Sequence, residues 1–242
     1  ERSLAPNGTI KSGWLTALIG LGTISSGLTG DIGESIDDRF IEWYSESVGN
    51  NEFPDDAVEP FANRSPGEVI DDIQAPTLVI SGLKDTLFTP NEGIQNYEEI
   101  GQNGVESRLM LYRAGHNAEE LAVSDDENEF MNDAALKWME RHVRGDDTVD
   151  VPEFSVFSEQ EEVWNEYTEY PPQDTSRETF DLSDISSGWG STTEINNPSP
   201  WKWWEWDREA TFDVPVDSEV EILGAPRLNV TVEADDELVL FA

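Results

Sequence analysis

The sequence predicts an α/β fold over residues 1–150 and an all-β sandwich over residues 151–242. Two observations lead to this prediction. In the first part, short apolar runs alternate with segments of helical periodicity, which is typical of a parallel sheet covered by helices. In the second part, Pro, Gly, Ser, Thr and aromatic residues dominate, and apolar residues recur at every second position. We therefore expect a domain boundary near residue 150.

The stretch from Ala75 to His116 has the pattern of one βαβ unit. Leu78–Ile80 is a short, continuous apolar run closed by Ser81-Gly82, which predicts a strand buried on both faces. Leu109–Tyr112 is a second apolar run and predicts a second strand. A single crossover helix between them makes the two strands parallel neighbours.

The crossover helix has recognisable start and stop signals. Thr89 is expected as its N-cap, with Pro90 at the first helical position and Glu92 closing a capping box. Gly101 or Gly104 is expected to end it. The apolar residues of this helix recur at helical spacing and are Ile94, Tyr97 and Ile100.

Other segments of the first part are expected to be helices or loops. Trp14–Leu28 is too short and too interrupted by Gly and Ser to cross a bilayer, and we expect a helical cover. Ile36–Val48 predicts an amphipathic helix, and 124–128 an acidic loop. A further helix is expected over Glu129–Val143. Its apolar face is predicted to consist of Met131, Ala135, Trp138 and Met139.

In the second part, Arg208–Val214 and Arg227–Val232 alternate as strands do. Trp201–Trp206 is rich in tryptophan. These indoles either line a sugar or substrate site or pack in a core or between domains. Packing is favoured, because large aromatic side chains most often bury area.

The chain is strongly acidic, with 52 Asp and Glu against 14 Lys and Arg and a formal charge of -38. Such a field repels nucleic acid and anionic membranes, so neither is expected as a partner. Nine Trp and ten Phe argue for a folded chain rather than a disordered one. Scattered acids and scarce lysine resemble proteins of extreme halophiles, which predicts a high-salt environment, cytoplasmic or extracellular. Cysteine is absent, so no disulfide forms.

One acid and one histidine follow the two predicted strands. Asp85 comes after the first strand, and His116 after the second. Ligands of open α/β sheets bind at the carboxyl ends of the strands, so both side chains are expected where chemistry occurs. An Asp and a His in this arrangement are two members of a nucleophile–His–acid triad, in the chain order of α/β-hydrolases. No Gly-x-Ser-x-Gly turn occurs in the sequence, so we expect the serine upstream of Glu1 and the chain to be a fragment.

Four motifs, in order along the chain, resemble those of a known family. They are Arg64–Pro66, Ala75–Leu78, Gly82–Phe88 and Gly115-His116. Together they resemble the X-Pro dipeptidyl-peptidase and cocaine-esterase family of serine hydrolases. Trp164–Pro171 and Gly224–Leu228 resemble parts of that family's C-terminal jelly-roll domain.

The resemblance implies a fold, an activity and two site residues. Residues 1–150 would be the C-terminal portion of an α/β-hydrolase domain with cap helices, and residues 151–242 an incomplete jelly-roll of the galactose-binding type. Asp85 would be the triad acid and His116 the triad base. The substrate would be a small ester or peptide, with no cofactor and no metal. The sequence does not fix an oligomeric state.

Alternatives remain at each position. Asp85 is otherwise an ordinary turn aspartate, and His116 a structural histidine; their placement after neighbouring strands favours the catalytic interpretation. His142 is expected to be structural, because a helix C-terminus favours positive charge. The acidic clusters Asp125–Glu127 and Asp235–Glu237 lack the spacing of a calcium loop, which favours solvated surface. The alternative function is a non-catalytic β-sandwich that binds carbohydrate or a partner.

Overall fold

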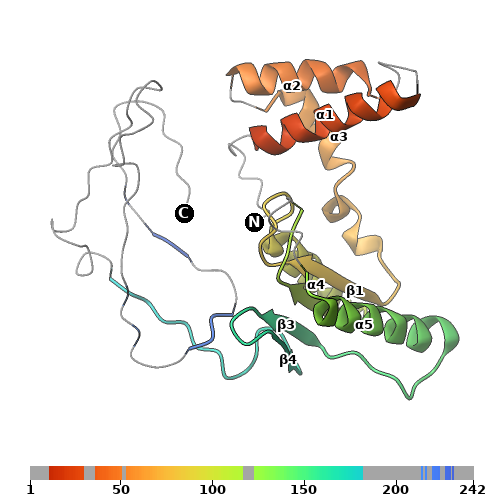
Figure 1. The fold of residues 1–242 in the computed structure, drawn as a ribbon, viewed down its shortest axis with the longest axis vertical. Helices are drawn as coiled ribbons and strands as arrows, with labels where there is room; N and C mark the ends of the chain where they lie inside the picture. Colours follow the sequence, from red (N-terminus) through yellow and green to blue (C-terminus); the bar gives the residue numbers. More distant parts are fainter. Residues whose placement is uncertain are drawn as a thin grey trace. The chain divides into compact units, whose positions relative to one another are not determined.

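The computed structural model describes residues 11–29, 36–50, 53–116 and 123–181, with short pieces at 214, 216, 220–223, 227–229 and 231. The chain divides into two compact units, residues 1–170 with 227–242, and residues 171–226. The helices and strands of the described part all belong to the first unit (Figure 1). In chain order they are α1 (Ser12–Thr29), α2 (Asp38–Asn50), α3 (Asp55–Ala62), the 3-10 helices η1 (Pro66–Glu68) and η2 (Ile70–Asp72), β1 (Thr77–Gly82), α4 (Pro90–Gln102), β2 (Ser107–Tyr112), α5 (Asp125–Arg144), β3 (Phe154–Ser158) and β4 (Val163–Tyr167).

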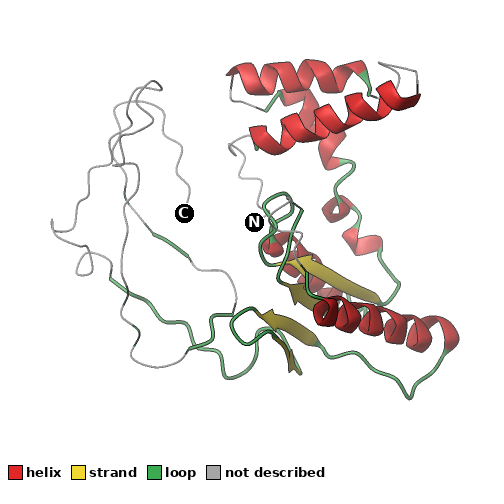
Figure 2. Ribbon diagram, in the orientation of Figure 1, coloured by secondary structure: helices red, strands yellow, loops and turns green. Residues whose placement is uncertain are grey.

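The strands form a four-stranded mixed sheet in the order β1-β2-β3-β4 (Figure 2). β1 pairs with β2 in parallel, with Val79 opposite Leu109, and β2 pairs with β3 in parallel, with Leu109 opposite Phe154. β3 and β4 are antiparallel. The described part is therefore an α/β structure with a mixed sheet. The prediction of an α/β fold class is confirmed for this part of the chain.

The sheet continues past the predicted boundary at residue 150. β3 has four buried residues in succession, and Phe154 is fully buried, as in a central parallel strand. A short apolar segment such as Phe-Ser-Val-Phe-Ser does not by itself specify which sheet the strand joins. The predicted strand Arg208–Val214 lies almost wholly outside the described residues. Of the predicted strand Arg227–Val232, residues 227–229 and 231 are described and are not assigned to a strand. Trp201–Trp206 lies outside the described residues too.

Helix α4 packs tightly against β1. A Cβ at Gly93 would lie 2.6 Å from the Cβ of Ser81, so only glycine permits this approach. Tyr97 and Ile100 are buried on the same side, as predicted. The capping-box prediction is wrong: Thr89 makes no side-chain cap bond, and its carbonyl accepts from the Glu92 N–H at 2.9 Å.

β1 is less buried than the sequence predicts. Its side chains are half-buried at most positions, and Ile80 is 39% exposed. β1 lies at the edge of the described sheet, where only β2 pairs with it. Burial on both faces depends on what covers the strand, and a run of apolar residues does not contain that information.

Helix α5 begins earlier than predicted. The expected acidic loop is its first turn, where Ser124 is the N-cap and accepts from the Glu127 N–H at 3.2 Å. Asp125 and Asp126 follow, and acidic side chains are favourable at a helix N-terminus. The helix ends at Gly145, with φ of 74°.

The buried face of α5 also differs from the prediction. Ala134 and Trp138 are buried and pack in one cluster with Met110 of β2 and Val151. Met139 was predicted on this face but is 58% exposed. The buried face instead contains Ala134 and Trp138, at i+3 and i+7 from Met131, which packs against the same cluster.

Helices α1 and α2 contain the predicted helical segments. In α2 and the residues after it, four aromatic rings contact one another, with centroids 5.3 to 5.9 Å apart. They are Phe40, Trp43, Phe53 and Phe61. No helix in the described part of the chain is long and apolar enough to span a membrane.

Candidate active site

The loop after β1 is joined to the end of β2 by backbone hydrogen bonds. The Leu83 N–H donates to the Tyr112 carbonyl at 2.7 Å, and the Lys84 N–H to the Ala114 carbonyl at 3.3 Å. A Cβ at Gly82 would overlap the Ala114 carbonyl oxygen, so the close approach requires glycine. The carboxyl ends of the two strands are thereby brought side by side.

Asp85 lies in this loop and is held by it. Only 5% of the residue is exposed. Its Oδ1 accepts hydrogen bonds from the Leu87 N–H and the Phe88 N–H, both at 2.9 Å. Two backbone donors fix the plane of the carboxyl group.

His116 lies just beyond β2 and contacts that carboxylate. Its Nδ1 is 2.5 Å from Asp85 Oδ2. Since an ionised carboxylate only accepts, Nδ1 carries the proton and donates, and the neutral ring has its lone pair on Nε2. The ring also packs edge-on against Phe88, with centroids 5.5 Å apart.

The two partners differ in exposure. The Asp85 side chain is 3% exposed and the His116 side chain 50%. In the part of the chain that the structure describes, no hydrogen bond to His116 Nε2 is made. The arrangement therefore presents a proton acceptor to solvent or substrate, with a buried carboxylate behind it.

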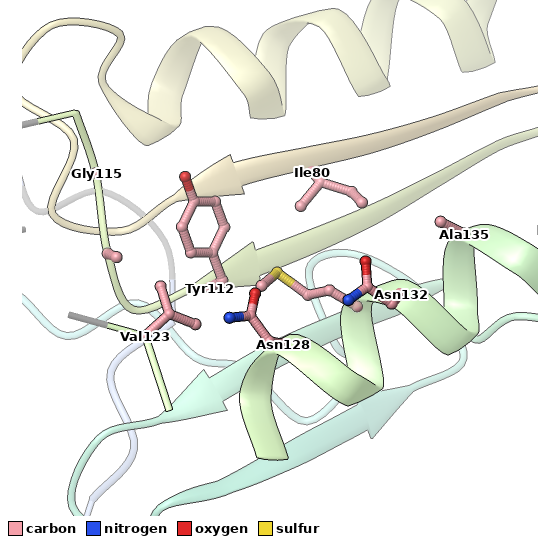
Figure 3. Close-up of a pocket in the computed structure, with 9 residues that line it drawn as sticks. Ile80, Tyr112, Gly115, Val123, Asn128, Asn132 and Ala135 are labelled. Atoms are coloured by element: carbon pink, nitrogen blue, oxygen red, sulfur yellow. The ribbon is translucent and has the colours of Figure 1, made fainter. Parts of the chain in front are cut away.

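A hollow of about 420 Å³ lies between β1, β2 and α5 (Figure 3). The strands contribute Ile80 and Tyr112, and α5 contributes Asn128, Asn132 and Ala135 on the facing side. Gly115, the neighbour of His116, is also part of its wall. Burial, with the charges of Asp85 and Glu127, raises the pKa of Tyr112, so its hydroxyl stays protonated.

The remaining candidate residues lie elsewhere. His142 is in the last turn of α5. The centre of its ring lies 4.1 Å from that of Trp138, and its Nε2 lies 3.9 Å from Glu106 Oε2. Within the described residues, no group of three or more His, Cys, Asp or Glu could hold a metal ion. Asp125 and Asp126 are exposed in the first turn of α5, and Asp235–Glu237 lies outside the described residues.

Sequence reasoning missed one residue near the site. Glu127 is fully buried, and its Oε1 accepts from the Arg113 N–H at 2.7 Å. The sequence Ser124-Asp125-Asp126-Glu127 has the S-x-x-E spacing of a capping box and could have indicated a helix start here. The burial of Glu127 could not have been deduced from it.

Comparisons with known proteins find similarity at the level of structure. No family model matches the sequence, and no curated protein matches it. Among solved structures, an aminopeptidase from the marine sediment archaeon Thaumarchaeota archaeon is similar to this chain, with a TM-score of 0.35 and 15% identity. The match covers 44% of this chain and 20% of the aminopeptidase chain, so this chain spans about a fifth of its length. A similarity of this degree carries no argument about activity.

Proposed function

We propose that this chain carries the acid and the base of a serine hydrolase that cleaves an ester or an amide. One observation supports the proposal above all others. Asp85 and His116, each just beyond one of two neighbouring parallel strands, are in contact through Oδ2 and Nδ1. In this geometry the basic nitrogen is Nε2, which makes no hydrogen bond with another described residue.

The proposed reaction is acyl transfer in two steps. His116 Nε2 takes the proton of a serine hydroxyl as the serine oxygen attacks the substrate carbonyl, and then returns that proton to the leaving alcohol or amine. In the second step, His116 takes a proton from water as the water oxygen attacks the acyl-enzyme, and returns it to the serine. Asp85 holds the tautomer and stabilises the imidazolium of each step.

The nucleophile in this proposal is a serine that this sequence does not contain in a Gly-x-Ser-x-Gly turn. Among the described serines, Ser81 Oγ lies under α4, 2.8 Å from where a Cβ at Gly93 would be. In this proposal the nucleophilic serine lies upstream of Glu1, in a longer protein that would contain this chain.

The family resemblance of the motifs gives the finer form of the proposal. The substrate is either a peptide from which an X-Pro dipeptide is removed or a small acyl ester. The described sheet and helices would then belong to an α/β-hydrolase domain, and a jelly-roll would begin beyond β4 rather than at residue 151. The aromatic Tyr112 and the apolar wall of the hollow fit either substrate class.

The test is a fluorophosphonate probe, which labels activated serines, applied to the full-length protein. We expect labelling of the wild type, loss of labelling in His116→Ala, and retention in the matched control His142→Gln. Protein that has not been treated with the probe is assayed in parallel with an X-Pro chromogenic amide and a short-chain chromogenic ester. Labelling that persists in His116→Ala would overturn the proposal, and unlabelled protein that binds glycan would favour the β-sandwich module.

A further inference from the structure

The loop that carries His116 has an anchor that the proposed chemistry does not use. Residues 113–124 connect β2 to α5, and His116 is the fourth of them. Glu127 lies just after this connection, in the first turn of α5. Its carboxylate accepts the Arg113 N–H at 2.7 Å, at the start of the connection. One side chain therefore ties together the two ends of the segment that contains His116.

The anchor is buried and charged. Glu127 has no exposed surface, and its Oε2 lies 3.5 Å from Arg113 Nη2 without a hydrogen-bond partner. The Arg113 guanidinium in turn lies 5.6 Å from the centre of the Phe157 ring, in β3. The carboxylate thus links the end of β2, the start of α5 and the face of β3.

Stability alone is a poor reason for such a group. Burying an ion pair is often neutral or unfavourable compared with apolar residues of similar volume, because desolvation offsets the attraction. An Oε2 atom without a hydrogen bond adds to that penalty. What the carboxylate supplies is a fixed distance between two backbone segments.

The distance between these two backbone segments affects the position of His116. Arg113 is three residues before His116, and the residues between them, Ala114 and Gly115, are buried. Asp85 is held separately, by the N–H groups of Leu87 and Phe88. A shift of Arg113 would therefore act on the segment before His116, which is also bonded to the Asp85 loop through the Ala114 carbonyl and the Lys84 N–H.

We infer that Glu127 is a positioning residue, which keeps His116 Nδ1 within hydrogen-bond distance of Asp85 Oδ2 by holding the Arg113 N–H. The catalytic meaning of this inference rests on the proposed function. The geometric part does not, because it concerns a contact between two residues of this chain.

The test uses isotope-labelled histidine in the 242-residue chain, which has two histidines and so gives a simple spectrum. The wild type should show the proton of His116 Nδ1–H far downfield, as expected of a short hydrogen bond to a carboxylate. We expect Glu127→Ala to lose this signal. Glu129→Gln, a charge change on an exposed position of the same helix, should leave it unchanged. A folded Glu127→Ala protein with the wild-type signal would overturn the inference.

If Glu127→Ala does not fold, the variant Glu127→Gln tests the positioning role instead. Its amide oxygen still accepts from the Arg113 N–H but without charge, and neutral hydrogen bonds are weaker. We expect the His116 Nδ1 proton to exchange with water about threefold faster than in the wild type, on the order of a lost charge-assisted contribution. An unchanged exchange rate in Glu127→Gln would overturn the inference.

These outcomes separate the two proposals. If the full-length protein is not labelled by the serine probe while Glu127→Ala loses the Nδ1 signal, the proposed function fails and the positioning role stands. If the probe labels the protein and the signal is unaffected by Glu127→Ala, the positioning role fails and the proposed function stands.

Discussion

The two loops that meet at the site are stabilised in different ways. Asp85 is held by donors two and three residues further along its own loop, Leu87 and Phe88. The segment with His116 is held instead by Glu127, fourteen positions after the Arg113 N–H that it accepts from. The acid is therefore positioned by local structure, and the base by a tertiary contact. We expect the base to be the more sensitive of the two to changes elsewhere in the molecule.

The largest effect is expected from His116→Ala. It removes the proposed general base, and comparable losses in serine hydrolases are on the order of 10⁶ in kcat. Turnover of a chromogenic ester or amide by the full-length protein is the measurement. A rate within tenfold of the wild type would remove His116 from the mechanism.

Asp85→Asn is expected to have a smaller effect, a loss of about 10⁴ in kcat. The amide keeps the shape of the side chain but no longer selects the tautomer with the proton on His116 Nδ1. Its Oδ1 position still has the Leu87 and Phe88 donors, so the loop should remain folded. Equal losses in Asp85→Asn and His116→Ala would contradict the orienting role proposed for Asp85. Thermal unfolding of the variant serves as the folding control.

Gly82→Ala should affect stability. The added Cβ would meet the Ala114 carbonyl oxygen and push the two loops apart, and such overpacking costs about 1 to 3 kcal/mol. Gly49→Ala is the matched control, because a Cβ there has no atom within 4 Å. Urea unfolding of both variants measures the difference. A Gly82→Ala protein as stable as Gly49→Ala would show that the two strand ends are not in this close contact.

The smallest effect is expected at alkaline pH. Burial, then the charge of Glu153 and its hydrogen bond with the hydroxyl, raise the pKa of Tyr97 from 10.0 to about 12. The folded state therefore favours the protonated phenol. Its contribution to stability is complete below pH 10 and is lost as the pH rises from 10 to about 12.

The Tyr97→Phe variant should lack this pH dependence. Urea midpoints of the wild type should fall more steeply than those of Tyr97→Phe between pH 10 and 12. Tyr44→Phe is the control, since the Tyr44 hydroxyl bonds to the Thr16 hydroxyl instead of a carboxylate. Parallel curves for the wild type and Tyr97→Phe would contradict the expected contribution.

Local signals in the sequence were enough to predict the βαβ unit and the order of its strands and helix. The apolar run at Leu78–Ile80, the Thr89-Pro90 helix start and the glycine at 104 each act within a few residues. Asp85 and His116 follow the ends of these elements, so their proximity could be predicted from topology. The length of α5 was underestimated, because an acidic first turn resembles a solvated loop when only composition is considered.

The sequence by itself determined the parallel pair of strands, the crossover helix and the acid and histidine at their ends, because propensities, breakers and periodicity are properties of neighbouring residues. Only the tertiary structure decided that β3 joins this sheet, that Ile80 is exposed at its edge and that Glu127 is buried against Arg113. Each of these depends on residues distant in the chain, and the free energy of a buried group is set by what surrounds it rather than by its own identity.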